Sequence, residues 1–320
     1  MTNKEDIQKL IVIGGPTASG KSSLAVELAL IFSGEIVNAD SMQVYRGMDV
    51  GTAKPSVSER RGVTHHLFDV VDPDKDFNAA IYRSLAVPVL KDIASRKKLC
   101  FVVGGTGLYI KTLLGGLISI PPADPTLREA LRQECEKHGA GFLHERLKKR
   151  DPESADKIHP NDKVRIMRAL EIIHLTQEPL SSLIRAHDFK NRSFDALKIC
   201  LQMAREQLYY RINERCLRMV EDGLVEETEG LLRKGYSPDL KPMKALGYRH
   251  VINFLEGRWD LDKATCQLQT DTRRYAKRQM TWFRADPDVF WYEPGEREKI
   301  VGKINEFICP QVESHLSVTS

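Results

Sequence analysis

A glycine-rich stretch near the start of the chain has the spacing of a phosphate-binding loop. Four residues separate Gly15 from Gly20, and Lys21 and Ser22 follow directly, as in the P-loop. Glycines let backbone N–H groups turn toward phosphate oxygens, and the following helix adds partial positive charge. The lysine reaches between phosphoryl groups, and the Ser22 hydroxyl is placed to bind Mg²⁺, the expected cofactor. The predicted diphosphate-binding residues are Gly15, Pro16, Thr17, Ala18, Ser19, Gly20, Lys21 and Ser22, and whether that diphosphate belongs to a nucleotide stays open.

One carboxylate is well placed for chemistry beside this loop. Asp40 follows the strand-like run 35–38, which is predicted to be a strand. Because ligands bind at the carboxyl ends of strands in open α/β sheets, Asp40 is expected to face the same crevice as Lys21. There it would accept a proton from an attacking group or hold Mg²⁺ through water. The alternative is that Asp40 only caps the next turn.

The run 99–103, another predicted strand, lacks the Asp with which P-loop ATPases hold Mg²⁺. It is followed instead by Gly104, Gly105, Thr106 and Gly107. The Thr106 hydroxyl is able to donate to a phosphate oxygen or to a reacting group. The alternative is a turn that only packs strand tightly against helix. The missing acid disfavours a motor or switch ATPase and favours a transferase that uses the loop to hold a diphosphate.

The elements that must position these residues alternate between strands and helices. Predicted strands at 10–13, 35–38 and 99–103 alternate with helices at 23–32 and 79–96, which is typical of βαβ units and a parallel sheet. Charged helical patterns at 126–149 and at 155–176, the latter broken at 159–160, predict an all-helical insertion. The sheet then resumes at 196–203, followed by helices at 205–222, 225–234, 248–255 and 261–284 and a short strand at 290–292.

The predicted fold class is therefore α/β, with a P-loop NTPase-like parallel sheet flanked by helices and an all-helical insertion domain. The catalytic core is expected to comprise residues 1–119 and 196–310, and the insertion residues 120–195. The stretch 186–193 is expected to be weakly ordered, and the polar tail 311–320 to be frayed.

Composition describes an ordinary globular chain of 320 residues with a formal net charge of +4. No apolar run approaches the roughly 20 residues that a membrane span needs, so no membrane association is expected. The six cysteines include no C-x-x-C pair, which favours reduced thiols in the cytoplasm over zinc or disulfides. Because the net charge is small, only the distribution of charge argues for nucleic acid.

Basic residues gather in three separate parts of the chain. Arg273, Lys277 and Arg284 share nearly one azimuth of the predicted helix 261–284, and no acidic residue lies between Arg273 and Arg284. Such a stripe is typical of phosphate contact, although a solvated basic face is the alternative. Arg274 and Arg278 widen the stripe, while Tyr275 and Trp282 are expected in the core. The other clusters are Lys241, Lys244 and Arg249 around Gly247, and Lys163, Arg165 and Arg168 in the insertion; together they suit a clamp around an RNA stem-loop.

Arg211 and Arg215 lie one helical turn apart and so share a face of their predicted helix. One of them is expected to close over the diphosphate. The alternative is an ordinary solvated helix face.

Together these motifs resemble the tRNA dimethylallyltransferases, also called tRNA isopentenyltransferases. The resemblance runs from about residue 10 to residue 284, and no Cys/His cluster follows, as in the bacterial form without a zinc finger. The blocks that carry it are GPTASGKS (residues 15–22), DSMQVY (40–45) with GMDVGTAKP (47–55), GGTGLY (104–109), HPND (159–162), KALGYR (244–249) and KRQMTWFR (277–284).

The resemblance implies transfer of a dimethylallyl group from dimethylallyl diphosphate to the N6 amine of the adenosine 3′ to the anticodon, in tRNAs that read codons beginning with U. It implies that Asp40 is the general base and that Thr106 contacts the diphosphate or orients the base. Lys21, Arg211 and Arg215 complete the expected catalytic set. The residues expected to contact the tRNA anticodon stem-loop are Asp40, Ser41, Met42, Gln43, Arg128, Val164, Arg165, Ile166, Met167, Arg168, Lys244, Ala245, Leu246, Gly247, Tyr248, Arg249, Lys277, Arg278, Gln279, Met280, Thr281, Trp282, Phe283 and Arg284.

Three other functions fit part of this pattern. An isopentenyltransferase acting on free AMP, ADP or ATP would keep the loop, Asp40 and Thr106 but would need no RNA-binding insertion. A small-molecule kinase would use the loop for ATP. An RNA-binding module with a vestigial loop would not require Asp40 beside an intact Lys21. The chain is expected to act as a monomer.

Overall fold

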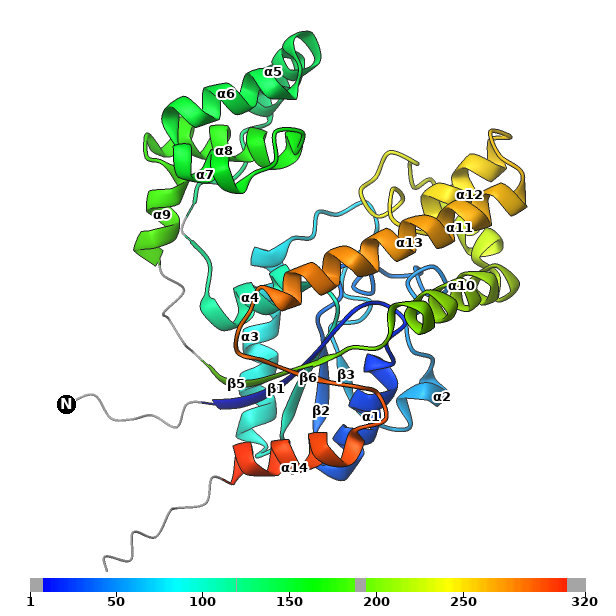
Figure 1. Ribbon diagram of the computed structural model, residues 1–320. Coiled ribbons are helices and arrows are strands. Elements are labelled where there is room, and N and C mark those ends of the chain that lie inside the picture. Colours follow the sequence, from blue (N-terminus) through cyan, green and yellow to red (C-terminus); the bar gives the residue numbers. More distant parts are fainter. Residues whose placement is uncertain (1–7, 119, 188–193, 310–320) are drawn as a thin grey trace, which may run out of the picture. The chain divides into compact units, whose positions relative to one another are not determined.

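A six-stranded sheet organises the larger part of the chain, and every pair of neighbouring strands in it is parallel (Figure 1). The computed structural model describes residues 8–118, 120–187 and 194–309. The chain divides into unit 1, residues 1–114 with 193–320, and unit 2, residues 115–192. The sheet lies in unit 1 in the order β3-β2-β4-β1-β5-β6, with strands β1 Gln8–Gly14, β2 Glu35–Asn38, β3 His65–His66, β4 Cys100–Val103, β5 Phe194–Leu201 and β6 Val289–Tyr292. The predicted parallel α/β fold is confirmed.

Side chains alternate between the two faces of each strand, so β1 feeds both layers of the core. Ile11 and Ile13 pack with α1 (Lys21–Ile31) and α14 (Arg297–Ile308). Leu10 and Val12 pack in the second core. That core includes α3 (Ala79–Ser95), α4 (Gly107–Gly115), α10 (Arg205–Glu221), α11 (Leu224–Arg233), α12 (Tyr248–Leu255) and α13 (Leu261–Arg284). Each fully buried Leu or Ile side chain contributes about 1.5–3 kcal/mol.

Unit 2 consists of helices only among its described residues, as the insertion was predicted to be. They are α5 (Pro125–His138), α6 (Ala140–Arg150), α7 (Pro152–Lys157), α8 (Lys163–Thr176) and α9 (Leu180–His187). The single helix predicted over 126–149 is wrong, because Gly139 adopts φ +86° and separates α5 from α6. The interruption predicted at 159–160 lies between α7 and α8. Most of the stretch predicted to be weakly ordered, and the tail 311–320, fall outside the described residues.

Four elements of unit 1 have no predicted range, namely α2 (Val57–Arg60), β3, α4 and α14. The short helix α2 precedes the two-residue strand β3, and α14 follows β6. In the described parts of the chain, every helix is too short or too polar to cross a membrane.

Candidate active site

The loop between β1 and α1 leaves the first N–H groups of α1 without side-chain partners. Gly20 precedes the helix with φ +89° and makes no side-chain cap hydrogen bond. Gly15 has φ +132°, and a Cβ built on it would lie 2.9 Å from the carbonyl oxygen of Leu201, so the loop packs directly on β5. The buried Ser19 hydroxyl also has no hydrogen-bond partner among the described residues. Unpaired donors at a helix N-terminus bind phosphate, so the predicted P-loop (residues 15–22) has the geometry of an anion site.

Lys21 begins α1 and folds back over the P-loop. Its Nζ donates a hydrogen bond to the carbonyl oxygen of Pro16 at 2.7 Å. Burial and the positive charge of Arg215 lower the pKa of Lys21 to about 8, and the nearby carboxylate of Asp40 opposes that shift. The loop therefore holds a cation that a bound anion would stabilise.

Asp40 uses one carboxylate oxygen to hold its own turn. Oδ1 accepts hydrogen bonds from the backbone N of Met42 at 2.8 Å and, more weakly, of Gln43 at 3.4 Å. No residue in the described part of the chain donates a hydrogen bond to Oδ2. The two predicted roles are thus compatible, because one oxygen caps the turn and the other is free to accept a proton.

Thr106 connects the turn after β4 to the Asp40 segment. Its Oγ1 accepts a hydrogen bond from the backbone N of Ser41 at 3.0 Å. Gly104 packs so closely that a Cβ on it would lie 2.2 Å from the carbonyl oxygen of Ala39. Tight packing, the alternative prediction for this turn, is therefore present, and Thr106 positions the residues beside Asp40.

Gln279 of α13 joins the same turn to the P-loop. Its Oε1 accepts a hydrogen bond from the backbone N of Thr17 at 2.8 Å, and its Nε2 donates to the carbonyl oxygen of Gly105 at 3.0 Å. A Cβ on Gly105 would lie 2.1 Å from that Nε2. The side chain is buried, and both ends of its amide are occupied within the protein, although Gln279 also lines the cavity described below. Phe283, also predicted to contact RNA, is buried against Gly14.

Lys21, Asp40 and Gln279 line one cavity of about 1450 Å³ that lies entirely within unit 1. Arg211 and Arg215 of α10 both line it, and a Cβ built on Gly20 would lie 3.9 Å from Arg211 Nη1. The shared face of these arginines is therefore directed into the cavity that holds the P-loop. Tyr275 lines the cavity too, which corrects its prediction as a core residue. Other lining residues include Thr17, Ala18, Gly20, Lys21, Ser22, Asp40, Ser41, Met42, Gln43 and Arg278.

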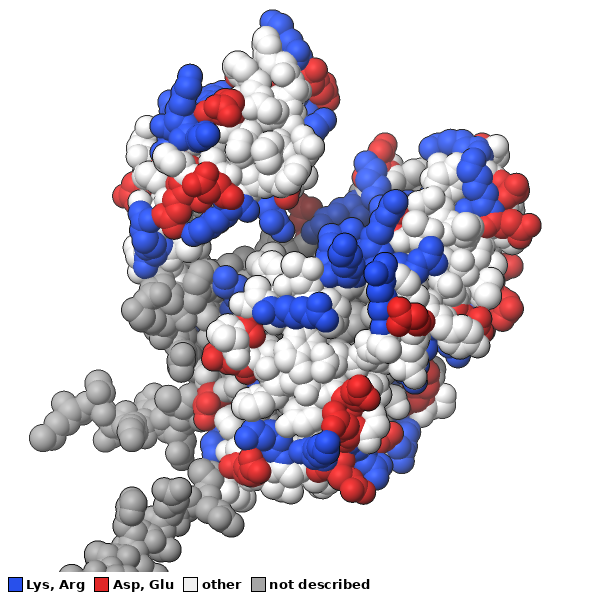
Figure 2. Space-filling model, viewed as in Figure 1, with Lys and Arg blue, Asp and Glu red and all other residues white. Residues whose placement is uncertain are grey.

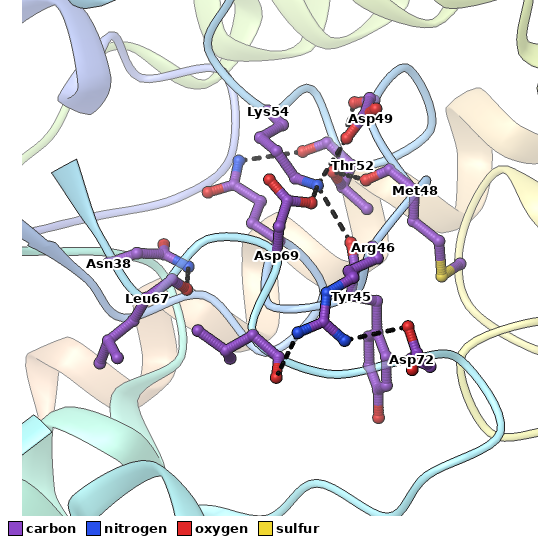
Figure 3. Close-up of polar contacts among 12 residues, drawn as sticks. Asn38, Tyr45, Arg46, Met48, Asp49, Thr52, Lys54, Leu67, Asp69 and Asp72 are labelled. Atoms are coloured by element: carbon purple, nitrogen blue, oxygen red, sulfur yellow. Dashed lines mark hydrogen bonds and ion pairs between the residues drawn. The ribbon is translucent and has the colours of Figure 1, made fainter. Parts of the chain in front are cut away.

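Residues 40–54, which we call the Asp40 wall, are held by a buried lysine (Figure 3). The Lys54 side chain is 3% exposed and pairs with Asp49 at 2.5 Å and Asp69 at 2.6 Å. Its Nζ also donates to the carbonyl oxygen of Tyr45 at 3.0 Å. Gln43 Nε2 donates to the carbonyl oxygens at positions 52 and 53, both at 3.1 Å. Lys54 stood in the sequence only as one letter of a motif, and no local signal indicated its two acidic partners.

The oxygen ligands that Mg²⁺ prefers are present at this site. Ser22 is exposed and lines the cavity together with Asp40, and no described residue bonds the Ser22 hydroxyl or Asp40 Oδ2. This donor set fits Mg²⁺. Elsewhere in the described ranges, no three His, Cys, Asp or Glu side chains form a metal-binding group. All six cysteines are free, four of them buried.

Basic side chains gather on the surface over α13 (Figure 2). Lys277 and Arg284 are exposed, and no described residue pairs with either side chain. Arg273 donates to Asn213 at 2.6 Å, and Arg274 pairs with Asp271 at 3.2 Å. Only part of the predicted basic stripe is therefore available to contact phosphate. Trp282, predicted to be buried, is 40% exposed and lies against Gly107, where an added Cβ would be 2.0 Å from the indole.

The cluster between α11 and α12 is mostly paired within the protein. Lys241 donates to the carbonyl oxygen of Phe77 at 3.1 Å, Lys244 pairs with Asp239 at 2.9 Å, and Arg249 pairs with Asp271 at 2.6 Å. Lys244 and Arg249 remain exposed at the cavity, which Ala245 and Leu246 also line. Gly247 and Tyr248 are buried, although Tyr248 also lines the cavity.

The cluster in unit 2 surrounds a buried acid. Glu171 is fully buried and accepts from Arg128 at 2.9 Å and from Arg168 at 2.6 Å. These two arginines, predicted to contact RNA, neutralise that carboxylate. Val164 and Arg165 are exposed, whereas Ile166 is buried and Met167 is half-buried. Of the predicted contacts at 164–168, Val164 and Arg165 are the best presented.

Comparison with known families identifies the architecture. The sequence model of isopentenyl transferase matches residues 8–71, and that of IPP transferase matches residues 43–286, most of the chain. The chain belongs to the IPP transferase family. The predicted family is confirmed.

Individual relatives agree along nearly the whole chain. The tRNA dimethylallyltransferase of Geobacter sulfurreducens is 55% identical over 285 residues, which cover 89% of this chain and 92% of the relative. The solved tRNA isopentenylpyrophosphate transferase of Bacillus halodurans is 40% identical with a TM-score of 0.69, covering 94% of this chain and 95% of that one. A solved eukaryotic dimethylallyltransferase acting on tRNA is 29% identical with a TM-score of 0.79, covering 94% and 79%.

Proposed function

We propose that this IPP transferase family member is a tRNA dimethylallyltransferase. It transfers the dimethylallyl group of dimethylallyl diphosphate to the N6 amine of the adenosine 3′ to the anticodon, in tRNAs that read codons beginning with U. The observation that carries the proposal is that the cationic P-loop and the free oxygen of Asp40 line one cavity. The transfer needs cationic groups that stabilise the leaving diphosphate and a base that accepts the proton of the amine.

The P-loop side of the cavity serves the leaving group. As the C–O bond of the allylic diphosphate breaks, negative charge grows on the diphosphate oxygens. Lys21, Arg211, Arg215 and the N–H groups of α1 stabilise that charge. Ser22 would hold Mg²⁺, which would add to the neutralisation of the diphosphate.

The Asp40 side serves the amine. The N6 amine of adenine is a poor nucleophile, so the new N–C bond forms as the allylic carbon loses its diphosphate. Asp40 accepts the N6 proton on its free oxygen, Oδ2. Extruding the base from a single-stranded loop costs little, at most a few kcal/mol. Ser41, Met42 and Gln43 line the cavity beside Asp40 and contact the extruded base.

The anticodon stem-loop is held by the exposed basic residues. Lys277, Arg278, Arg284, Lys244 and Arg249 contact phosphates from unit 1, and Val164 and Arg165 contact the RNA from unit 2. Ile166 and Phe283 were also predicted to contact RNA; they are buried and support these exposed residues from the protein interior. We place the reaction in the cytoplasm, where free cysteines stay reduced, and assign it to a monomer.

A free-nucleotide isopentenyltransferase is the nearest alternative, since the isopentenyl transferase model matches residues 8–71. That match ends before β4, α10 and α13, so it covers the P-loop and the Asp40 wall alone. A small-molecule kinase remains the alternative from another class, because the P-loop by itself also suits ATP.

One assay separates these functions. The protein is incubated with Mg²⁺ and labelled dimethylallyl diphosphate, in parallel with unmodified tRNA and with AMP, and a third reaction contains labelled ATP. We expect label in tRNA and none in AMP. Label in AMP alone would establish the free-nucleotide enzyme, and phosphate transfer from ATP would establish a kinase.

A further inference from the structure

One carboxylate on α11 binds three consecutive N–H groups of the Asp40 wall. Glu227 Oε2 accepts hydrogen bonds from the backbone N of Asp49 at 2.9 Å and of Val50 at 2.8 Å. Glu227 Oε1 accepts from the backbone N of Gly51 at 3.1 Å and from the hydroxyl of Tyr248 at 2.6 Å. Hydrogen bonds to an ionised acceptor are stronger than those between neutral groups. This carboxylate is therefore the main tether of the segment 49–51.

The negative charge of Glu227 interacts mainly with the backbone N–H groups of the segment 49–51. No Lys or Arg in the described ranges pairs with it, so its negative charge is balanced by backbone dipoles, as in an anion-binding nest. Gly51 packs on the Tyr248 ring so closely that an added Cβ would lie 2.5 Å from its Cζ. Burial and the neighbouring Glu227 raise the pKa of Tyr248, so its hydroxyl stays a donor. Packing and hydrogen bonding therefore both hold Gly51 in place.

The tethered segment is connected to Asp40 by two further contacts. The carbonyl oxygens of Thr52 and Ala53 accept from Gln43 Nε2. The backbone N of Gln43 in turn donates to Asp40 Oδ1 at 3.4 Å. Glu227 itself is not among the residues that line the cavity, whereas Asp40, Gln43 and residues 49–54 all line it. Glu227 therefore supports the wall from behind.

We propose that Glu227 is a positioning residue for group transfer, one that holds the Asp40 wall so that the free oxygen of Asp40 meets the amine. The proposal rests on the proposed function. Glu227 has no hydrogen bond or ion pair to the P-loop, so its influence falls on the proton-accepting side of the cavity and not on the diphosphate side. Misplacing a reacting group by about 1 Å lowers a rate by about 100-fold.

The test compares four proteins in steady-state transfer to tRNA: wild type, E227Q, E227D and E229Q. The glutamine variant keeps one acceptor oxygen but turns an NH₂ group toward backbone donors. We expect its kcat to fall about 10- to 100-fold while its KM for dimethylallyl diphosphate stays within about twofold. E227D keeps the charge and is expected to recover part of kcat. E229Q makes the same chemical change on the same helix, where Glu229 pairs only with Arg233 among the described residues, and is expected to match wild type.

Thermal unfolding of each variant separates positioning from folding. A lower Tm with wild-type kcat per folded molecule in E227Q would make Glu227 structural only and overturn the proposal. A KM for dimethylallyl diphosphate that rises along with the loss of kcat would overturn it as well, because the effect would then run through the P-loop. Wild type that prenylates no tRNA would refute the proposed function itself, which is a different outcome.

Should E227Q fail to fold, Y248F replaces it. That variant removes one of the four hydrogen bonds to Glu227 and leaves the three backbone bonds. We expect kcat to fall about threefold with an unchanged KM for dimethylallyl diphosphate. A kcat equal to that of wild type in Y248F would overturn the proposal.

Discussion

The P-loop and the Asp40 wall line one cavity but are held in place by different means. The P-loop is positioned by β1 on one side and α1 on the other, with glycines that take conformations other residues rarely adopt. The Asp40 wall has no strand or helix of its own between β2 and α2. It is held by side chains, chiefly Lys54 from within and Glu227 from α11.

Two lysines show what this difference means. Lys21 donates to a backbone carbonyl, has no carboxylate partner in the described chain, and has a lowered pKa. Lys54 is buried and pairs with two aspartates. The P-loop thus keeps an unsatisfied cation for a ligand, and the Asp40 wall uses a satisfied cation to keep its shape. The P-loop is arranged to bind a ligand, and the Asp40 wall is arranged to hold Asp40 in a fixed position.

The largest effect is expected from removing the proton acceptor of the Asp40 wall. Asp40→Asn keeps an oxygen for the Met42 N–H group but no longer accepts a proton. Single-turnover transfer is expected to fall about 10²- to 10⁴-fold, as for the loss of a general base. Binding of tRNA, measured by filter retention, should change little. Transfer at the wild-type rate would show that the base is elsewhere.

The next effect comes from the cation of the P-loop. Lys21→Met removes charge stabilisation of the leaving diphosphate, and loss of one such group lowers kcat about 10²- to 10³-fold. Because the lowered pKa means that the folded protein holds this charge at a cost, Tm is not expected to fall. A calorimetric scan beside the kinetic assay checks both points. A large drop in Tm would mean that Lys21 is structural, as Lys54 is.

The matched substitution in the Asp40 wall is expected to lower stability, unlike Lys21→Met, and to lower the rate of transfer by less. Lys54→Met leaves Asp49 and Asp69 unpaired around an apolar side chain. We expect the free energy of unfolding to drop by about 1–3 kcal/mol and transfer to fall about tenfold through displacement of Asp40. Urea denaturation measures the first and steady-state kinetics the second. Unchanged stability would remove the distinction drawn between the two lysines.

The smallest effect is a pH dependence of diphosphate binding. Lys21 loses its proton as pH rises through about 8, so affinity for dimethylallyl diphosphate is present below that pH and lost above it. Between pH 8 and pH 9 the protonated fraction falls about fivefold, and KM should rise about in proportion. Lys21→Arg stays charged and should flatten the profile. An equally steep rise in that variant would assign the titration to another group.

Local patterns in the sequence predicted the P-loop wall well. The strand 10–13, the glycine spacing and the helix that follows all depend on neighbouring residues, and β1 and α1 are where those patterns place them. The contacts that hold the other wall join residues far apart in the chain: Glu227 is 178 positions from Asp49, and Thr106 is 65 positions from Ser41. Nothing in one sequence marks such pairs.

The prediction of burial from helix periodicity failed at two positions of α13, and the failure has a physical reason. Tyr275 and Trp282 lie opposite the basic stripe of α13 and were predicted to be buried, but Tyr275 lines the cavity and Trp282 is partly exposed. A face turned away from solvent can meet a cavity as well as a core, and periodicity does not distinguish them. The helix α14 was missed although Ile300 and Ile304 have helical spacing and are buried.

The packing of Gly15 on Leu201 has a consequence for how the protein is made. β5 supplies the floor of the P-loop, yet unit 2 separates it from β1 in the chain. At a synthesis rate of about 5–20 residues per second, β1 waits roughly 10–40 s for that partner. Unit 2 is therefore synthesised before the floor of the diphosphate site exists, and a nascent chain becomes competent to bind substrate only after β5 has been synthesised.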